Sequence, residues 1–242
     1  MTETIGNVYD DTERARAYAD LEFPGTYYLA FRDLPMLLRK YACGTRALDF
    51  GCGTGRSTRF LRDLAFEVIG VDVSEIMLGH ARRHDPHGDY RSVADGALAG
   101  FDTGTLDLIL AAFTFDNVPT GQQKTSALRE LRRLLAPGGR LIVIVSSPDI
   151  YWHEWASFST RDYPANRSAR DGDSVRIVML DVPDRRPVVD VLCSDAHYRE
   201  LFDAAGLRVV DTVRPLATGS EPVRWVSETA IPPWTIYVLG AA

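Results

Sequence analysis

The chain has 242 residues, a formal net charge of −6 and a balanced composition, with 45% hydrophobic and 25% charged residues. The negative charge argues against a nucleic-acid backbone as the main partner. No apolar run reaches the ~18 residues that span a bilayer, and the acidic first residues do not resemble a signal peptide. Cys43, Cys52 and Cys193 are scattered and lack metal-ligand spacing. We therefore expect a cytoplasmic protein with reduced thiols, no bound metal, no nucleic-acid partner and no membrane partner.

The order of predicted elements indicates an α/β fold. Residues 1–44 precede the first predicted strand, and we expect them to form a helical N-terminal lid before a single domain over residues 45–242. The predicted strands are 47–50, 66–72, 89–93, 106–112, 140–147, 207–213 and 234–240. The predicted helices are 55–65, 74–83, 121–136 and 195–205. Strands that alternate with helices in this way are typical of a doubly wound, mostly parallel sheet.

Residues 147–194 interrupt this alternation after the fifth predicted strand. Their first part is loop-like, whereas residues 174–192 (SVRIVMLDVPDRRPVVDVL) predict two strands around a proline-bounded turn. Ligands of a doubly wound sheet bind outside the carboxyl ends of its strands. We therefore expect this inserted hairpin to cover a substrate pocket.

Three glycines at every second position follow the first predicted strand, in the stretch ALDFGCGTG (47–55). A dinucleotide-binding loop would place a further glycine at Arg56 or Thr58, depending on which glycine begins the pattern. The Gly-Lys-Ser/Thr of a phosphate-binding P-loop is absent. The loop therefore predicts a ligand that approaches the backbone closely, and its spacing weakens the prediction of a dinucleotide without excluding it.

The same stretch, read from Asp49 as D-x-G-x-G-x-G, resembles motif I of the class I S-adenosylmethionine (SAM)-dependent methyltransferases. Asp72 ends the second strand, Asp95 follows the third, and LLAPGGRLIV leads into the fifth, as in that family. The resemblance covers roughly residues 45–146 and the last two strands. It implies a Rossmann-like, seven-stranded sheet with an antiparallel C-terminal strand, and SAM as the cofactor.

The resemblance also implies roles for individual residues. Asp49 would order the glycine loop and contact the methionine ammonium, and Asp72 would bind both ribose hydroxyls. The residues expected at the cofactor are Tyr18, Asp49, Gly51, Gly53, Gly55, Asp72, Val73, Ala94, Asp95, Gly96 and Phe113. Two alternatives stay open, because Asp72 could cap the helix that begins at Ser74 and Asp95 could serve a turn.

Candidate substrate residues follow the fourth and fifth strands and lie in the expected lid. The expected contacts are Tyr28, Phe115, Tyr151, Trp152 and Trp155. His153 and Asp116 are the candidate bases, since a base is needed only where the acceptor must lose a proton. For each aromatic residue, plain packing is the alternative.

Together these features predict a methyltransferase that moves a methyl group to oxygen or nitrogen of a small, aromatic or planar metabolite by in-line displacement. We expect a monomer or homodimer whose partner is this small molecule. Two alternatives remain: an NAD(P)-dependent oxidoreductase on a related sheet, and a non-catalytic SAM-binding subunit.

Overall fold

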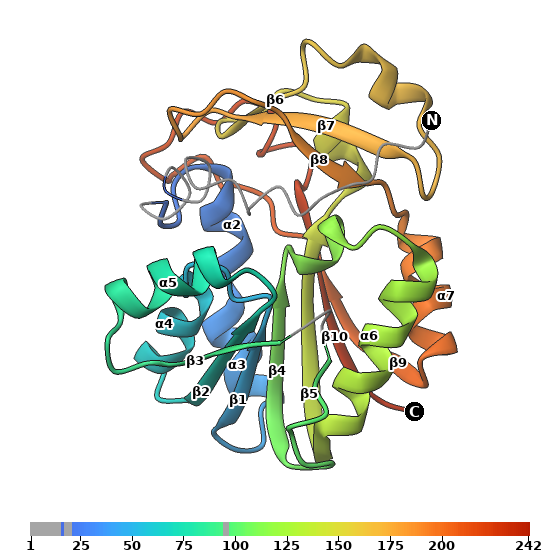
Figure 1. The fold of residues 1–242 in the computed structure, drawn as a ribbon. Coiled ribbons are helices and arrows are strands. Elements are labelled where there is room, and N and C mark those ends of the chain that lie inside the picture. The colour runs from blue at the N-terminus through green and yellow to red at the C-terminus, as the bar shows by residue number, and fades with distance from the viewer. Residues whose placement is uncertain (1–15, 17–20, 94–96) are drawn as a thin grey trace.

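A computed structural model describes residue 16 and residues 21–93 and 97–242, and its centre is a seven-stranded sheet (Figure 1). The strands are β1 (Arg46–Phe50), β2 (Glu67–Asp72), β3 (Asp89–Ser92), β4 (Leu106–Ala112), β5 (Leu135–Ser146), β9 (Leu207–Val213) and β10 (Trp234–Ala241). Their order is β3-β2-β1-β4-β5-β10-β9. Only β10 runs antiparallel to its neighbours. The predicted fold class is confirmed.

Six α-helices accompany this sheet in the described part of the chain, and four of them were predicted. They are α2 (Thr26–Arg32), α3 (Leu34–Tyr41), α4 (Arg56–Asp63), α5 (Glu75–His84), α6 (Gly121–Leu134) and α7 (Asp195–Ala204). Helix α6 ends two residues earlier than expected, and β5 begins at Leu135 rather than at residue 140. The reason is Pro137, which disfavours helical geometry at the residue before it.

Alternating side chains of the central strands bury both faces of the sheet. Ala47 and Ile144 contribute to the core on one face, together with apolar residues of α3 and α4. Leu48 and Val143 contribute to the opposite core, together with α6 and α7. This two-sided burial leaves the carboxyl ends of the parallel strands as the edge where a ligand site can form.

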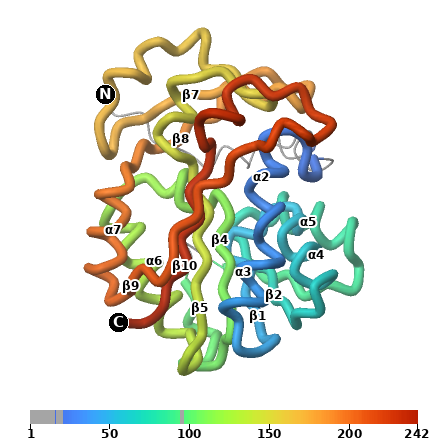
Figure 2. The backbone as a smooth tube through the Cα atoms, turned by 180° about the vertical axis from the view of Figure 1, so that it is seen from behind, coloured from blue at the N-terminus to red at the C-terminus, as the bar shows by residue number. Residues whose placement is uncertain are grey.

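The insertion forms a second, smaller sheet above that edge. It contains β6 (Phe158–Ser159), β7 (Ser174–Met179) and β8 (Val188–Val191), and both pairings are antiparallel. The predicted hairpin is therefore present, and β6 adds a strand that was not expected. In both views this sheet lies over the ends of β4, β5 and β10, close to α2 and to the segment before β10 (Figures 1 and 2). Three short 3₁₀ helices lie at this end of the chain's strands: η3 (Thr114–Asn117) follows β4, η4 (Pro148–Tyr151) connects β5 to β6, and η5 (Pro164–Ser168) lies between β6 and β7.

Glu228 joins three of the segments that lie above the main sheet. Its side chain is fully buried and accepts hydrogen bonds from the Thr26 hydroxyl at 2.6 Å and from the Ala156 amide at 2.7 Å. The amides of Val226 and Ser227 donate to its other oxygen. One carboxylate thus holds α2, the insertion and the 214–233 segment together.

No helix within the described ranges is long and apolar enough to cross a membrane.

Candidate functional site

The glycine loop after β1 has a backbone that few other residues could adopt. Gly51, Gly53 and Gly55 have φ angles of 72°, 53° and 79°. A Cβ atom on Gly51 would lie 2.4 Å from the Thr114 side chain, and one on Gly55 would lie 2.5 Å from the Tyr90 hydroxyl. At Gly53 the nearest atom would be a methionine methyl at 3.2 Å. Close packing therefore requires the outer two glycines, whereas Gly53 leaves its side of the loop open.

Asp49 lies beneath this loop and is fully buried. The hydroxyls of Ser57 and Thr58 donate to its Oδ2 atom at 2.7 and 2.6 Å. Its Oδ1 atom has no hydrogen-bond partner among the described residues. Burial raises the pKa of this carboxyl group to about 6. A buried carboxyl oxygen that lacks a hydrogen-bond partner fits a ligand that supplies an N–H donor, such as an amino group.

Asp72 ends β2 beside the same loop and is half-buried. Its two carboxylate oxygens accept hydrogen bonds from the Gly53 amide at 2.8 Å and the Ser74 amide at 2.9 Å. The hydroxyl that caps α5 belongs to Ser74, which accepts from the Met77 amide. The loop therefore fixes the orientation of Asp72, and the capping role falls to Ser74.

Four of the expected cofactor residues, Tyr18, Ala94, Asp95 and Gly96, lie outside the described residues. Val73 follows Asp72 at the surface and is half-exposed.

Arg56 connects the glycine loop to the N-terminal segment. Its buried guanidinium lies 5.1 Å from the ring centre of Phe23 and 5.0 Å from that of Tyr27. It also donates to the carbonyls of Leu21 and Glu22. Arg56, the first residue of α4, thus holds an aromatic layer, formed by the rings of Phe23 and Tyr27, against the glycine loop.

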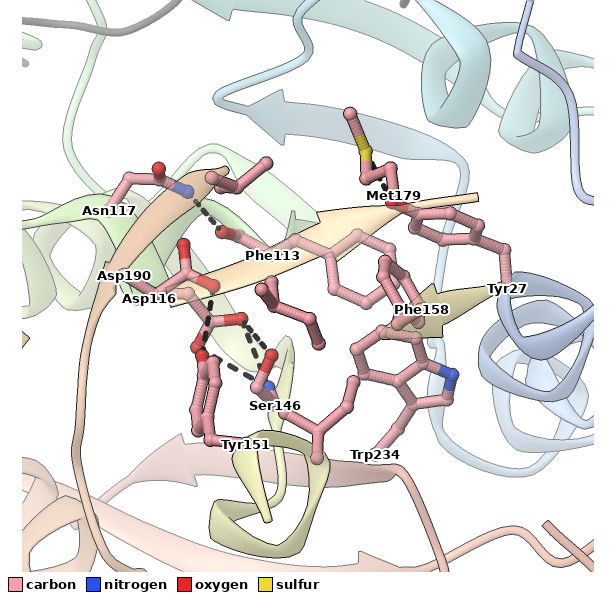
Figure 3. Close-up of a pocket in the computed structure, with 13 residues that line it drawn as sticks. Tyr27, Phe113, Asp116, Asn117, Ser146, Tyr151, Phe158, Met179, Asp190 and Trp234 are labelled. Carbon is pink, nitrogen blue, oxygen red and sulfur yellow. Dashed lines mark hydrogen bonds between the residues drawn. The ribbon is translucent and has the colours of Figure 1, made fainter. Parts of the chain in front are cut away.

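A cavity opens at the carboxyl ends of β4 and β5, next to this layer, and aromatic side chains form one side of it (Figure 3). Trp234 is central, with ring centres 4.7 Å from Phe113, 5.8 Å from Tyr27 and 5.7 Å from Phe158. Its indole N–H donates to the Thr26 carbonyl at 2.8 Å. These rings come from four separate segments, so the aromatic side exists only in the assembled fold.

Polar side chains gather on the opposite side of the cavity (Figure 3). Asp116 accepts from the amide and hydroxyl of Ser146 at 3.0 and 2.8 Å. Asp190 accepts from the Tyr151 hydroxyl at 3.0 Å. Burial raises the pKa of both carboxyl groups, and the charge of Asp116 further raises that of Asp190. The Lys124 ammonium lies near Asp116 and opposes the rise in its pKa.

The structure brings some of the expected substrate residues to this cavity and not others. Tyr151 lines it, together with the candidate base Asp116 and with Phe113, which was expected at the cofactor. Phe115 is fully buried in the core on the α6 and α7 side, with its ring 6.2 Å from that of Phe50. Tyr28 is partly exposed, and the neighbouring Tyr27 lines the cavity instead.

The aromatic residues that follow η4 lie outside the lining of this cavity. Trp155 is buried and donates to the Ile150 carbonyl at 2.8 Å. Trp152 donates to the Asn166 carbonyl at 3.2 Å and lies beside a different surface depression. His153 is half-buried, with its ring edge-on to Trp155 at 6.3 Å, and is not among the residues that line the cavity.

Sequence reasoning missed Ser146, Met179, Asp190 and Trp234, which all line the cavity. The position of Trp234 could have been inferred from the sequence. Trp234 begins the antiparallel strand β10, and such a strand begins at the edge where the parallel strands end. Trp234 accordingly pairs with Ser146, the last residue of β5. Asp190 was the one acidic residue in the apolar run VVDVL. No group of three potential metal-ligating side chains occurs among the described residues.

Comparisons with known proteins agree with this architecture. Residues 48–143 match a family model described as a methyltransferase domain. The chain is 27% identical over 204 residues to N-demethylindolmycin N-methyltransferase of Streptomyces griseus, an alignment that covers 83% of this chain and 85% of that protein. It is 40% identical over 108 residues to demethylmenaquinone methyltransferase of Thermus thermophilus, of which it spans about half, 48%.

Solved structures share the fold at low sequence identity. The CcbJ methyltransferase of Streptomyces caelestis superposes with a TM-score of 0.63 at 20% identity, over 92% of this chain and all (100%) of that one. The PH0226 protein of Pyrococcus horikoshii gives 0.65 at 17% identity, over 95% of this chain and 99% of that one. The chain therefore shares the Rossmann-like fold of class I methyltransferases, and its residues 48–143 match a methyltransferase domain, a type of domain whose cofactor is S-adenosylmethionine.

Proposed function

We propose that the protein transfers a methyl group from SAM to a nitrogen or oxygen atom of a small, aromatic or planar molecule held in the cavity of Figure 3. The observation that carries this proposal is the direct connection between the glycine loop and the cavity. Gly51 packs against Thr114, whose hydroxyl donates to the Phe50 carbonyl at 2.8 Å. The neighbouring residue, Phe113, lines the cavity.

The cofactor supplies a methyl group on a sulfonium, which needs only a nucleophile held close and in line. The chain's own contribution is to position that nucleophile. Trp234, Phe113 and Phe158 offer flat apolar surfaces to a planar acceptor. The inserted sheet contributes Met179 and Val188, which exclude water from above.

The residues that hold the cofactor are part of the same proposal. We assign the ribose hydroxyls to Asp72, the methionine ammonium to Asp49, and the close backbone approach to Gly53. The segment before β1 and the insertion 147–194 act as the cover over cofactor and acceptor. Tyr18, Ala94, Asp95 and Gly96 remain assigned by resemblance to the family.

The printed activities of the relatives support a small acceptor without fixing the atom. They include an N-methyltransferase and, at 30% identity over 62% of its length, a ubiquinone biosynthesis O-methyltransferase of Methylococcus capsulatus. The aromatic side of the cavity supports a planar acceptor independently of those names.

Calorimetry on an Asp72→Ala variant tests the cofactor assignment. Loss of hydrogen bonds to a carboxylate should weaken SAM binding by about 1.5–3 kcal/mol. Asp89→Ala is the matched control, because Asp89 is exposed and pairs only with the exposed Arg91 among the described residues. Equal SAM affinity in both variants would refute the ribose role of Asp72. Tight SAM binding with no transfer to any small acceptor would favour a non-catalytic subunit.

A further inference from the structure

Asp190 has an unused hydrogen-bonding position inside the cavity. Its side chain is 7% exposed and lines the cavity. The Tyr151 hydroxyl donates to Oδ2. No described residue donates to Oδ1. Oδ1 is not one of the fully enclosed side-chain atoms that lack a partner, so it keeps accessible surface and can accept a hydrogen bond from a ligand in the cavity.

The surroundings of Asp190 are short of positive charge. Strand β8 packs against η3, which places Asp190 near Asp116. The other titratable groups that face this pair are Lys124 from α6, Tyr151 from η4, and Cys193 and Tyr198 at α7. Lys124 is the single cation among them, and it donates to the Phe115 carbonyl. Two buried carboxyl groups therefore share one ammonium.

Asp116 and Asp190 differ in how well their oxygens are satisfied. Ser146 donates twice to Asp116, whose second oxygen is 3.5 Å from the Tyr198 hydroxyl. Protein donors thus hold Asp116 in place, whereas Asp190 lines the same cavity with one oxygen that no described residue contacts. A ligand that places a flat group against Trp234 and an N–H donor against Asp190 would satisfy both sides.

We infer that the methyl acceptor is an amine, cationic in water, whose nitrogen binds Asp190 Oδ1 while its aromatic part packs against Trp234. This inference rests on the proposed function and narrows its acceptor from oxygen or nitrogen to a basic nitrogen. Asp190 is then a catalytic residue, and Asp116 is a positioning residue that raises its basicity.

The proton balance follows from this arrangement. The raised pKa of Asp190 means that it holds a proton in the empty cavity, and this proton leaves to solvent when the cationic amine binds. An ammonium ion has no lone pair for attack, so the Asp190 carboxylate then accepts one N–H proton and leaves a neutral amine. The nitrogen lone pair then forms the C–N bond, while the C–S bond breaks and its electron pair goes to sulfur. The product is a methylated ammonium ion, and the proton on Asp190 passes to water when the product leaves. Burial raises the pKa of Asp190, which makes its carboxylate a stronger base than an exposed one.

The test is a binding experiment on the complex with S-adenosylhomocysteine. The probes are aromatic primary and secondary amines, from benzylamine to naphthyl size, each paired with the alcohol and the carboxylate of the same skeleton. Calorimetry compares the native protein with Asp190→Asn, which keeps an acceptor for Tyr151. Asp181→Asn is the control, since it removes an exposed carboxylate from the same insertion.

We expect amines to bind at least about tenfold more tightly than their alcohol partners, and Asp190→Asn to lose that preference while Asp181→Asn keeps it. Alcohols or carboxylates that bind as well as amines would overturn the inference, as would an amine preference that survives in Asp190→Asn or an absence of any binding amine. Binding of S-adenosylhomocysteine is measured first in every variant. If the native protein fails to bind it, the proposed function itself fails.

Discussion

At the residue scale, the site is defined by side chains whose role depends on what surrounds them. Asp49 and Asp72 lie at the carboxyl ends of two neighbouring strands, beside the glycine loop. Their positions were predictable because the glycine spacing and the strand ends are local features of the sequence. Asp190 was not predictable, since a single acidic residue in an apolar strand acquires its meaning only from Asp116 and Tyr151, which lie far away in the chain. The roles expected for the aromatic residues around His153 stay predictions, since Trp155 packs inside the fold and Trp152 lines a separate pocket.

The carboxyl pair predicts how stability depends on pH. The pKa of Asp190 is raised in the folded state, so the folded protein holds a proton that the unfolded chain releases above about pH 4. The stability that this proton contributes is complete below the ordinary pKa of Asp and is lost as pH rises toward and through the raised value. In the absence of ligands, the thermal midpoint of the native protein should therefore fall by several degrees more between pH 5 and 8 than that of Asp190→Asn. Two parallel curves would contradict the raised pKa.

At the element scale, the main sheet was predictable and the cover was predictable only in part. Strands and helices of the main sheet have strong periodicity, and the hairpin of β7 and β8 is signalled by its proline-bounded turn. The contacts among α2, the insertion and the 214–233 segment have no local signal, because Glu228 joins residues such as Thr26 and Ala156 across most of the chain.

Glu228→Ala tests this joint. The Thr26 hydroxyl and the amides of Ala156 and Val226 would lose their acceptor, at a cost of about 1–3 kcal/mol for each donor left unsatisfied. We expect the free energy of unfolding to fall by at least about 2 kcal/mol, measured by urea denaturation, with Glu228→Gln intermediate. Glu200→Ala, which removes an exposed carboxylate from α7, should change it by less than about 0.5 kcal/mol. A similar small effect for Glu228→Ala would mean that the cover is held by its apolar contacts alone.

At the scale of the whole molecule, the fold places a cofactor loop, an aromatic surface and a buried acid at one edge of a parallel sheet. The main sheet supplies the loop and Phe113, the insertion supplies Met179 and Asp190, and β10 supplies Trp234. The aromatic surface and the buried acid line one cavity, and the loop lies next to it through the contact of Gly51 with Thr114, which supports methyl transfer to a small aromatic acceptor.

The most direct test of that central claim is transfer of an isotopically labelled methyl group from SAM. The purified protein is incubated with labelled SAM and the paired amines and alcohols, or with separated small-molecule, protein and nucleic-acid fractions of a cell extract. Mass spectrometry then locates the label. We predict a label on oxygen or nitrogen of a small aromatic molecule, greatly reduced for Asp72→Ala and retained for Asp89→Ala. A label found only in protein or nucleic acid, or no transfer despite SAM binding, would contradict the proposed function.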